Sequence, residues 1–355
     1  MLVIVDARMV NASGIGTYIR NLLREILQKD SFQIKCIVNK DQVDVIRKLG
    51  VNDYIIFKSK FFSPFEQIEY LIKLPHADVY WTPHFNTPIF PMRYKFKKRV
   101  VTIHDMFPYA FRDNFNFLGF SYINLLMKRA SRLSDLIFTV SEFSKSEIIK
   151  FLNVDDSKVC TVPLGVDPGF HLNAEDIKID KKYILCVGNI KPHKNIKKAI
   201  EAFNRISPII PDYELVIVGK SDGFYSPEKG FDSILKSNPK VRFTGFVTFE
   251  ELRKYYSEAS MLLFPSLYEG FGLPVLEAMA FNLPIAASSR ASIPEVGSDY
   301  IVYFDPENLD EIAKAMLGIL NGELQCSVHG YGENLAKYTW EGCANKTIEY
   351  IKKLA

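Results

Sequence analysis

Cysteine is scarce in this sequence and forms no motif. The five cysteines show no CxxC spacing and no histidines at metal-ligand spacing; they are Cys36, Cys160, Cys186, Cys326 and Cys343. This scatter excludes the common zinc-binding patterns and fits a reduced compartment. The first three lie in apolar runs, where a thiol packs as a small core side chain.

Long apolar runs and a strong net charge are also missing. No apolar run approaches the roughly 20 residues of a membrane-spanning helix, and no basic leader precedes the first apolar segment, "LVIVD". We therefore expect no signal peptide and a cytoplasmic protein, with peripheral attachment to the inner face of the plasma membrane as an alternative. The formal net charge of +3 is too small to indicate a nucleic-acid partner.

Positive charge is concentrated in one stretch, "RYKFKKR" at residues 93–99. Its interpretation stays open between a solvated strand edge and contact with an anionic membrane surface or a phosphate-bearing ligand. Two aromatic-rich segments, 60–74 and 107–127, also have two interpretations. They are either core helices or an apolar face suited to a lipid-linked ligand.

Short apolar runs alternate with helical patterns along both halves of the chain. The runs are "LVIVD", "QIKCIV", "YIIF", "DVYWTP", "RVVTIHD" and "DLIFTVS", then "YILCVGN", "ELVIVGK", "VRFTG", "MLLFPS", "PIAAS" and "IVYF". Continuous apolarity indicates strands covered on both faces, and the helices between them indicate parallel crossovers. A length of 355 residues exceeds what one core usually serves. The sequence therefore predicts an α/β protein with two doubly wound parallel sheets.

The loop "VPLGVDPGF" at residues 162–170 has the proline and glycine content of a hinge. We place the first domain at residues 1–165 and the second at residues 166–333. The last stretch, "GENLAKYTWEGCANKTIEYIKKL", is one long amphipathic helical pattern.

Ligands of doubly wound sheets bind beyond the carboxyl ends of the strands, so functional side chains are expected in the loops that follow them. In "FPSLYEGFGLPVLEAMA", Glu269 and Glu277 flank a turn with Gly270 and Gly272, and a helix is expected to begin near Pro274. Free N–H groups at a helix start favour phosphate, and the carboxylates suit ribose and sugar hydroxyls. The alternative is helix-dipole stabilisation by Glu277 and a surface position for Glu269.

Two further loops carry candidate residues. Lys194 lies at a loop-to-helix junction in "CVGNIKPHKNIKK", where its ammonium either binds a diphosphate or is simply solvated. His104 and Asp105 end the run "RVVTIHD", either as contacts to a sugar or a leaving group or as a core and capping pair. His84 follows another strand, in "WTPHFNTP". The chain has no Asp-x-Asp motif, which disfavours a metal-bound diphosphate.

Gly14 and Gly16 precede the first helical pattern, in "NASGIGTYIRNLL". The third glycine of the dinucleotide fingerprint is absent, so a Rossmann oxidoreductase is the weaker alternative to a nucleotide-sugar enzyme. A non-catalytic saccharide- or nucleotide-binding module is a third candidate.

Taken together, these residues resemble a known family. "EGFGLPVLE" resembles the Glu-x7-Glu motif of family-4 retaining glycosyltransferases, and "GIGTYIRNLL", "VVTIHDMFP", "TVSEFSKSEI", "YILCVGNIKPHKNI" and "PIAASSRASIPEVGSD" match that family in its usual order. The resemblance covers essentially the whole chain. It implies the GT-B fold, in which two Rossmann-like domains face each other and a C-terminal helix crosses back. Residues 334–355 are therefore assigned to the first, acceptor-binding domain, and residues 166–333 form the nucleotide-sugar-binding domain.

The resemblance also implies a role for each matching residue. His104, Lys194 and Glu269 would be catalytic, with Lys194 on the diphosphate and the other two on the donor sugar, and Glu277 would hold the ribose. The remaining donor contacts would be Gly14, Gly16, Asn189, Phe246, Val247, Gly270, Phe271, Gly272 and Leu273, and the acceptor contacts would be His84 and Asp105.

One position departs from the family pattern. Many members carry an arginine directly after the glycine of "VG", and this chain has Asn189 there. The diphosphate clamp is expected to be weaker, with Lys191 or Lys220 as candidates to compensate.

The implied reaction is transfer of a hexose from a GDP- or UDP-linked donor to a saccharide hydroxyl, with retention of configuration and without a metal or other cofactor. Mannose is the favoured sugar, and a polyprenyl-linked saccharide of a bacterial surface polysaccharide such as O-antigen is the favoured acceptor. The alternative is a glucosyl- or other hexosyltransferase with a soluble acceptor.

Overall fold

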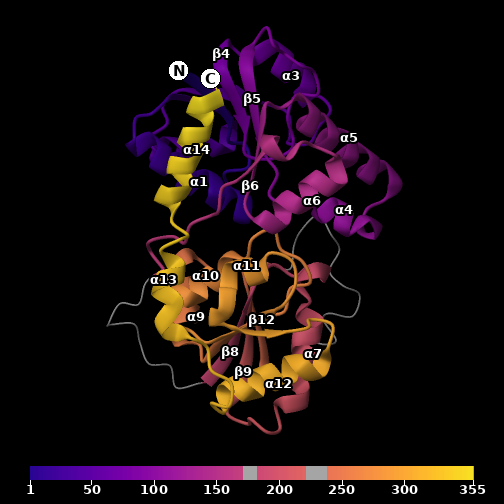
Figure 1. Cartoon of the computed structure of the whole chain (residues 1–355), viewed down its shortest axis with the longest axis vertical. Helices are drawn as coiled ribbons and strands as arrows, with labels where there is room; N and C mark the ends of the chain where they lie inside the picture. Colours follow the sequence, from indigo (N-terminus) through magenta and orange to yellow (C-terminus); the bar gives the residue numbers. More distant parts are fainter. Residues whose placement is uncertain (171–181, 221–237, 355) are drawn as a thin grey trace. The chain divides into compact units, whose positions relative to one another are not determined.

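The computed structural model describes residues 1–170, 182–220 and 238–354, and the chain divides into two compact units (Figure 1). Unit 1 is Met1–Gly165 with Tyr338–Ala355, and unit 2 is Val166–Lys337. The predicted boundary gave residues 334–337 to the first domain. They belong to unit 2, where the amide of Asn334 donates a 2.8 Å hydrogen bond to the carbonyl of Val296.

Unit 1 is built on a parallel sheet of seven strands in the order β3-β2-β1-β4-β5-β6-β7. The strands are β1 (Leu2–Asp6), β2 (Gln33–Asn39), β3 (Tyr54–Phe57), β4 (Ala77–Thr82), β5 (Phe96–Thr102), β6 (Leu136–Thr139) and β7 (Val159–Thr161). The first six were expected from their apolar runs. The edge strand β7 was not, because a strand of three residues has no pattern of its own and forms only by pairing with β6.

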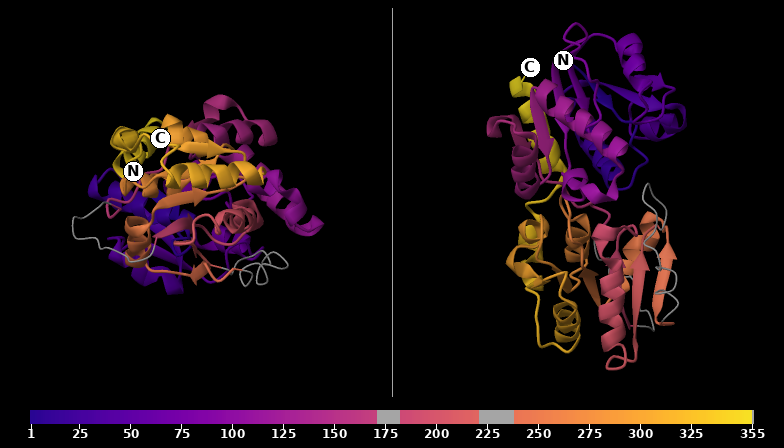
Figure 2. Two further views of the ribbon diagram at one scale, coloured as in Figure 1. Left: turned by 90° about the horizontal axis from the view of Figure 1, so that it is seen from below. Right: turned by 90° about the vertical axis from the view of Figure 1, so that its right-hand side faces the viewer.

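Helices cover this sheet, as continuous apolar strands require (Figures 1 and 2). They are α1 (Gly14–Gln28), α2 (Val43–Lys48), α3 (Glu66–Lys73), α4 (Phe107–Ala110), α5 (Phe117–Leu133) and α6 (Glu142–Leu152). In α1, Tyr18, Leu22 and Ile26 recur at every fourth position and are fully buried against the sheet.

The C-terminal segment returns to unit 1 as a separate helix. The predicted single helix is in fact two, α13 (Tyr331–Leu335) in unit 2 and α14 (Trp340–Leu354) in unit 1. Thr339 explains the break, because its Oγ1 accepts a 3.0 Å hydrogen bond from the N–H of Gly342 and so starts a new helix. Trp340 then packs beside Tyr18 of α1, with ring centroids 6.4 Å apart.

Unit 2 has a second parallel sheet, in the order β10-β9-β8-β11-β12-β13. Its strands are β8 (Lys182–Val187), β9 (Tyr213–Val218), β10 (Val241–Gly245), β11 (Met261–Phe264), β12 (Ile285–Ser288) and β13 (Val302–Phe304). Its remaining helices are α7 (Ile196–Ile206), α9 (Phe249–Glu258), α10 (Leu273–Ala280), α11 (Ile293–Gly297) and α12 (Leu309–Leu320). The two sheets confirm the predicted fold class, with two Rossmann-like α/β units.

Candidate active site

The strand order of unit 2 reverses between β8 and β11, which are paired neighbours. In open α/β sheets the carboxyl ends at such a switch point are the usual ligand site. The loop after β8 leads to Lys194 and α7, and the loop after β11 carries Glu269 and leads to α10. The fold therefore places both candidate loops at the carboxyl ends of neighbouring strands of one sheet.

Backbone and amide contacts tie these two loops together. The N–H of Leu267 donates to the carbonyl of His193 at 2.7 Å. The side-chain amide of Asn195 donates to the carbonyls of Pro265 and Pro306, at 3.2 and 2.7 Å. Asn195 adopts a left-handed backbone conformation with φ of 57°, which asparagine tolerates better than most residues. These hydrogen bonds hold the two loops against each other.

Lys194 and Glu269 meet between the loops. Their Nζ and Oε1 atoms are 2.6 Å apart, and the side chains are only 18% and 13% exposed. The Lys194 ammonium also lies 5.8 Å from the centroid of the Phe264 ring. The hydroxyl of Ser292 is 2.8 Å from the carbonyl oxygens of both Glu269 and Phe271, which holds the turn in place. A cation and a carboxylate are therefore fixed side by side at the switch point.

The helix after this turn begins where the sequence predicts. Helix α10 starts at Leu273 with Pro274 in its first turn, and Gly272 precedes it with φ of 112°. A side chain would strain the backbone at that φ. Gly270 does not have a positive φ, so the conformational freedom expected at both glycines is used only at Gly272.

Glu277 lies one turn into α10 and is held by a tyrosine of α9. The hydroxyl of Tyr256 donates a 2.7 Å hydrogen bond to Glu277 Oε2. Burial raises the pKa of Glu277 to about 7; the Tyr256 hydrogen bond works against this rise, and the Asp167 charge adds to it. Tyr256 itself is fully buried and stacks on Phe281, with ring planes 6° apart.

Other donor-site candidates of unit 2 also follow the carboxyl ends of strands of this sheet. The Asn189 side chain accepts a 3.1 Å hydrogen bond from the backbone N–H of Lys220, which joins the loops after β8 and β9. The Lys220 ammonium lies 4.4 Å from the ring centroid of Phe246. Phe246 and Val247 follow β10, and the Phe246 ring is largely exposed.

In unit 1 the two candidate histidines follow neighbouring strands, β4 and β5. His104 Nε2 lies 3.0 Å from the carbonyl of Pro83, so this nitrogen carries the proton and Nδ1 is the acceptor. His84 Nδ1 accepts a hydrogen bond from the N–H of Asn86 at 3.1 Å, so the proton of the neutral ring is on Nε2. Burial lowers the pKa of His104 to about 4 and that of His84 to about 3. Both imidazoles are neutral near pH 7.

Of the three other candidates of unit 1, Asp105 and Gly16 make local structural contacts and Gly14 does not. Asp105 Oδ1 accepts a 2.9 Å hydrogen bond from the N–H of Phe107, the first residue of α4. The N-cap of α4 is Met106, so Asp105 is not the helix cap that the sequence offered as an alternative. Gly16 packs against the loop after β1, where an added Cβ would lie 2.6 Å from the Val10 carbonyl oxygen. Gly14 has no such constraint, since an added Cβ would meet nothing within 4 Å.

Three basic residues of the stretch 93–99 form ion pairs or hydrogen bonds within unit 1. Arg93 pairs with Asp135 at 2.9 Å, and Lys97 pairs with Asp78 at 2.7 Å. Arg99 is buried and donates to the carbonyl of Pro88 at 2.7 Å. These contacts favour a structural interpretation of the stretch.

Sequence reasoning missed two residues of this site. Tyr256 is one of two adjacent tyrosines in α9, and only the tertiary structure shows which one reaches Glu277. Ser292 lies in a separate loop after β12, and no sequence signal ties it to the turn at Glu269. Over residues 1–170, 182–220 and 238–354, no group of three or more potential metal ligands gathers. None of the helices described is long and apolar enough to cross a membrane.

Comparison with known proteins identifies the family. Residues 12–170 match the model of Glycosyltransferase Family 4, and residues 170–338 match that of Glycosyl transferases group 1. The chain belongs to the family-4 glycosyltransferases and has their GT-B fold.

Among curated relatives, an O-antigen chain mannosyltransferase of Salmonella typhimurium, RfbU, is 28% identical, over 95% of this chain and 96% of the relative. O-antigen chain mannosyltransferase B of Escherichia coli is 27% identical, over 76% of this chain and 74% of its own length. The matching family models make the chain a glycosyltransferase.

Solved structures share the fold at low sequence identity. Sucrose-phosphate synthase from Thermosynechococcus elongatus superposes with a TM-score of 0.79 at 18% identity, covering 99% of this chain and 98% of that one. HepE of Anabaena, solved in complex with UDP and glucose, gives 0.78 at 13% identity, covering 99% of this chain and all of that one.

Proposed function

We propose that this protein transfers mannose from a GDP- or UDP-linked donor to a polyprenyl-linked saccharide, with retention of configuration and without a metal ion, at the cytoplasmic face of the membrane. The observation that carries the proposal is the Lys194–Glu269 pair, 2.6 Å apart at the switch point of unit 2. The names of the two O-antigen relatives support mannose as the sugar.

The donor would be held by charge and by hydroxyl acceptors. The Lys194 ammonium would neutralise the diphosphate, which then takes the place of Glu269 as its counter-ion. Glu269, released from the ion pair, would accept from hydroxyls of the sugar, and Glu277 would accept from the ribose diol. Leu273 and Phe271 would line the phosphates and sugar through the turn that Gly272 permits.

The proposed chemistry is a front-face displacement. The bond between the anomeric carbon and the diphosphate oxygen breaks, the acceptor oxygen bonds the same face, and the departing phosphate takes the acceptor's proton. Such a step needs positioning and stabilisation of the leaving group, which Lys194 would supply. His104 Nδ1, unprotonated in this structure, would accept from a donor-sugar hydroxyl.

Radiolabelled transfer to a membrane extract tests the proposal. GDP-mannose, UDP-glucose and related donors are supplied in turn, with EDTA present, and the label is followed into lipid and water-soluble fractions. We expect mannose label in the lipid fraction. Label only in a small soluble product would overturn the lipid acceptor, and an inverted anomer by NMR would overturn the mechanism.

A further inference from the structure

Helix α3 of unit 1 exposes its apolar side chains and buries its polar ones. Its buried residues are Glu66, Gln67 and Tyr70. The exposed face begins at the N-cap with Phe65, 72% exposed, and continues with Ile68, Leu71 and Ile72, the last 73% exposed. The aromatic-rich segment was expected either as a core helix or as an outward apolar face, and for α3 the outward face is what the structure shows.

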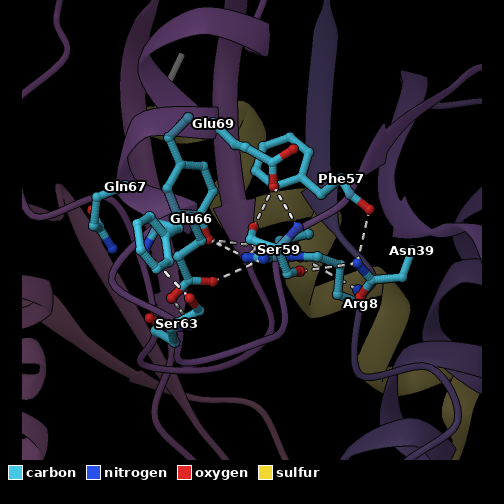
Figure 3. A network of polar contacts seen from close by, with 12 residues as sticks. Arg8, Asn39, Phe57, Ser59, Ser63, Glu66, Gln67 and Glu69 are labelled. Carbon is cyan, nitrogen blue, oxygen red and sulfur yellow. Dashed lines mark hydrogen bonds and ion pairs between the residues drawn. The ribbon is translucent and has the colours of Figure 1, made fainter.

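A buried charge network holds α3 in this orientation. Arg8 donates to Glu66 Oε2 at 2.8 Å (Figure 3). It also donates to both oxygens of Asp6, at 2.8 and 2.6 Å. All three side chains have no exposed surface. Tyr70 donates to Asp6 at 2.9 Å, and Asn86 donates to Glu66 Oε1 at 2.8 Å. Rolling the helix to bury its apolar face would expose or unpair these charges, at a large cost.

Helix α5 has a second exposed apolar face that ends in positive charge. Phe117 and Leu118 are 75% and 79% exposed at its start, and Leu125 is exposed two turns later. Lys128, Arg129 and Arg132 are exposed at its other end. The segment Phe117–Leu133 contains no acidic residue. Apolar side chains that can be buried at a bilayer surface and basic side chains that attract anionic lipids are the two contributions to interfacial binding of a helix.

The two helices are neighbours within unit 1. Burial raises the pKa of Tyr122 of α5, and the nearby Glu66 carboxylate of α3 raises it further. Figure 1 shows both helices on the right-hand side of unit 1. Glu69, the other acidic residue of α3, pairs with Lys73 at 2.6 Å.

We propose that the exposed apolar side chains of α3 and α5, together called the α3–α5 surface, dock this protein on an anionic lipid bilayer. Phe65, Ile68, Ile72, Phe117 and Leu118 would enter the acyl boundary, and the basic end of α5 would contact lipid phosphates. The inference rests on the proposed function, because a polyprenyl-linked acceptor would be met at such a surface.

Vesicle sedimentation tests the α3–α5 surface. The full chain is mixed with vesicles of phosphatidylcholine alone or with 30% phosphatidylglycerol. We expect the unmodified chain to bind the anionic vesicles. The affinity for these vesicles should fall about tenfold or more in the Ile68→Ser/Ile72→Ser variant. It should also fall in Lys128→Gln/Arg129→Gln/Arg132→Gln, with the larger loss at low salt. The matched control is Ile209→Ser, since Ile209 is an apolar side chain of unit 2 that is 65% exposed; it should bind as the unmodified chain does.

Donor binding is measured on the same variants to separate the two proposals. GDP and UDP affinity should be unchanged in all three, since none of these residues lies in unit 2 loops that carry the donor candidates. Donor binding without sedimentation would overturn the α3–α5 surface alone, and sedimentation without donor binding would overturn the proposed function alone. If Ile68→Ser/Ile72→Ser instead converts a dimer to a monomer in analytical ultracentrifugation, with vesicle binding unchanged, the occupant is a second copy and the proposal is wrong.

Discussion

The Tyr256 hydroxyl donates a 2.7 Å hydrogen bond to Oε2 of Glu277, from a fully buried position in α9. This bond fixes the carboxylate proposed to hold the donor ribose, and it lowers a pKa that burial has raised to about 7. Glu277 is thus poised to change its protonation state close to neutral pH.

Replacing Tyr256 with Phe removes the hydrogen bond and retains the stacking on Phe281. Because the bond lowers the pKa of Glu277, the variant's pKa should lie above 7, and a protonated carboxyl accepts less well from a diol. We expect donor affinity to fall about tenfold at pH 7, with the loss partly recovered at pH 9. Calorimetric titration with GDP and UDP between pH 6 and pH 9 measures this. A uniform loss at every pH would point to misfolding instead.

Replacing Glu277 with Gln should stabilise the fold at alkaline pH while it weakens donor binding. The folded-state pKa of Glu277 is about 7 against an ordinary 4.5, so the folded chain binds the extra proton. The stability that the protonated Glu277 contributes is fully present below about pH 4.5 and is lost as the pH rises through 7. Ionising this group in the fold costs about 3 kcal/mol at most. The melting temperature of the variant should therefore exceed that of the unmodified chain at pH 8 and match it more closely at pH 5.

Lys194 is expected to discriminate diphosphates from monophosphates. Lys194→Gln removes the charge proposed to face the diphosphate, and charge-assisted hydrogen bonds are worth about 1.5–3 kcal/mol. GDP or UDP affinity should fall roughly ten- to hundredfold, and GMP or UMP affinity much less. Lys197→Gln is the control, since Lys197 is exposed on the neighbouring helix. Equal losses for mono- and diphosphates would argue against the diphosphate role.

His104 should act without titrating. Burial lowers its pKa to about 4, so the imidazole stays neutral from pH 5.5 upward and adds no inflection to the pH profile of kcat. His104→Ala should lower kcat by roughly 10²-fold if Nδ1 contacts the donor sugar near the reaction centre. His76→Ala, at an exposed site of unit 1, serves as the control. An inflection between pH 6 and pH 7 that disappears in His104→Ala would contradict this assignment.

Arg8 is expected to be the most sensitive single position for the stability of unit 1. Arg8→Met leaves Asp6 and Glu66 as buried carboxylates without their cation, a loss of about 3–5 kcal/mol. Both tryptophans of the chain, Trp81 and Trp340, belong to unit 1, so their fluorescence in urea reports on this unit. Arg47→Met, at an exposed arginine of α2, should cost less than about 1 kcal/mol. A loss as small as that of Arg47→Met would contradict the stabilising role given to Arg8.

Much of the fold could be predicted because its signals are local. Twelve apolar runs each became a strand, and Pro274 marked the start of α10 to within one residue. Ile196, Ile200 and Phe203, which recur at helical spacing in the sequence, are buried in α7. Strand β7 and the break before α14 escaped prediction, because one depends on a neighbouring strand and the other on a single threonine cap.

The sequence by itself determined which loops follow the strands and hold the candidate residues, since strand ends, glycines and charged residues can all be read along the chain. Only the tertiary structure decided which side chains meet: Lys194 with Glu269, 75 residues apart, and Tyr256 with Glu277. It also decided that α3 turns its apolar face outward. A periodic pattern shows that a helix has two faces, but which of them is buried depends on the partner, and here Arg8 binds the polar one.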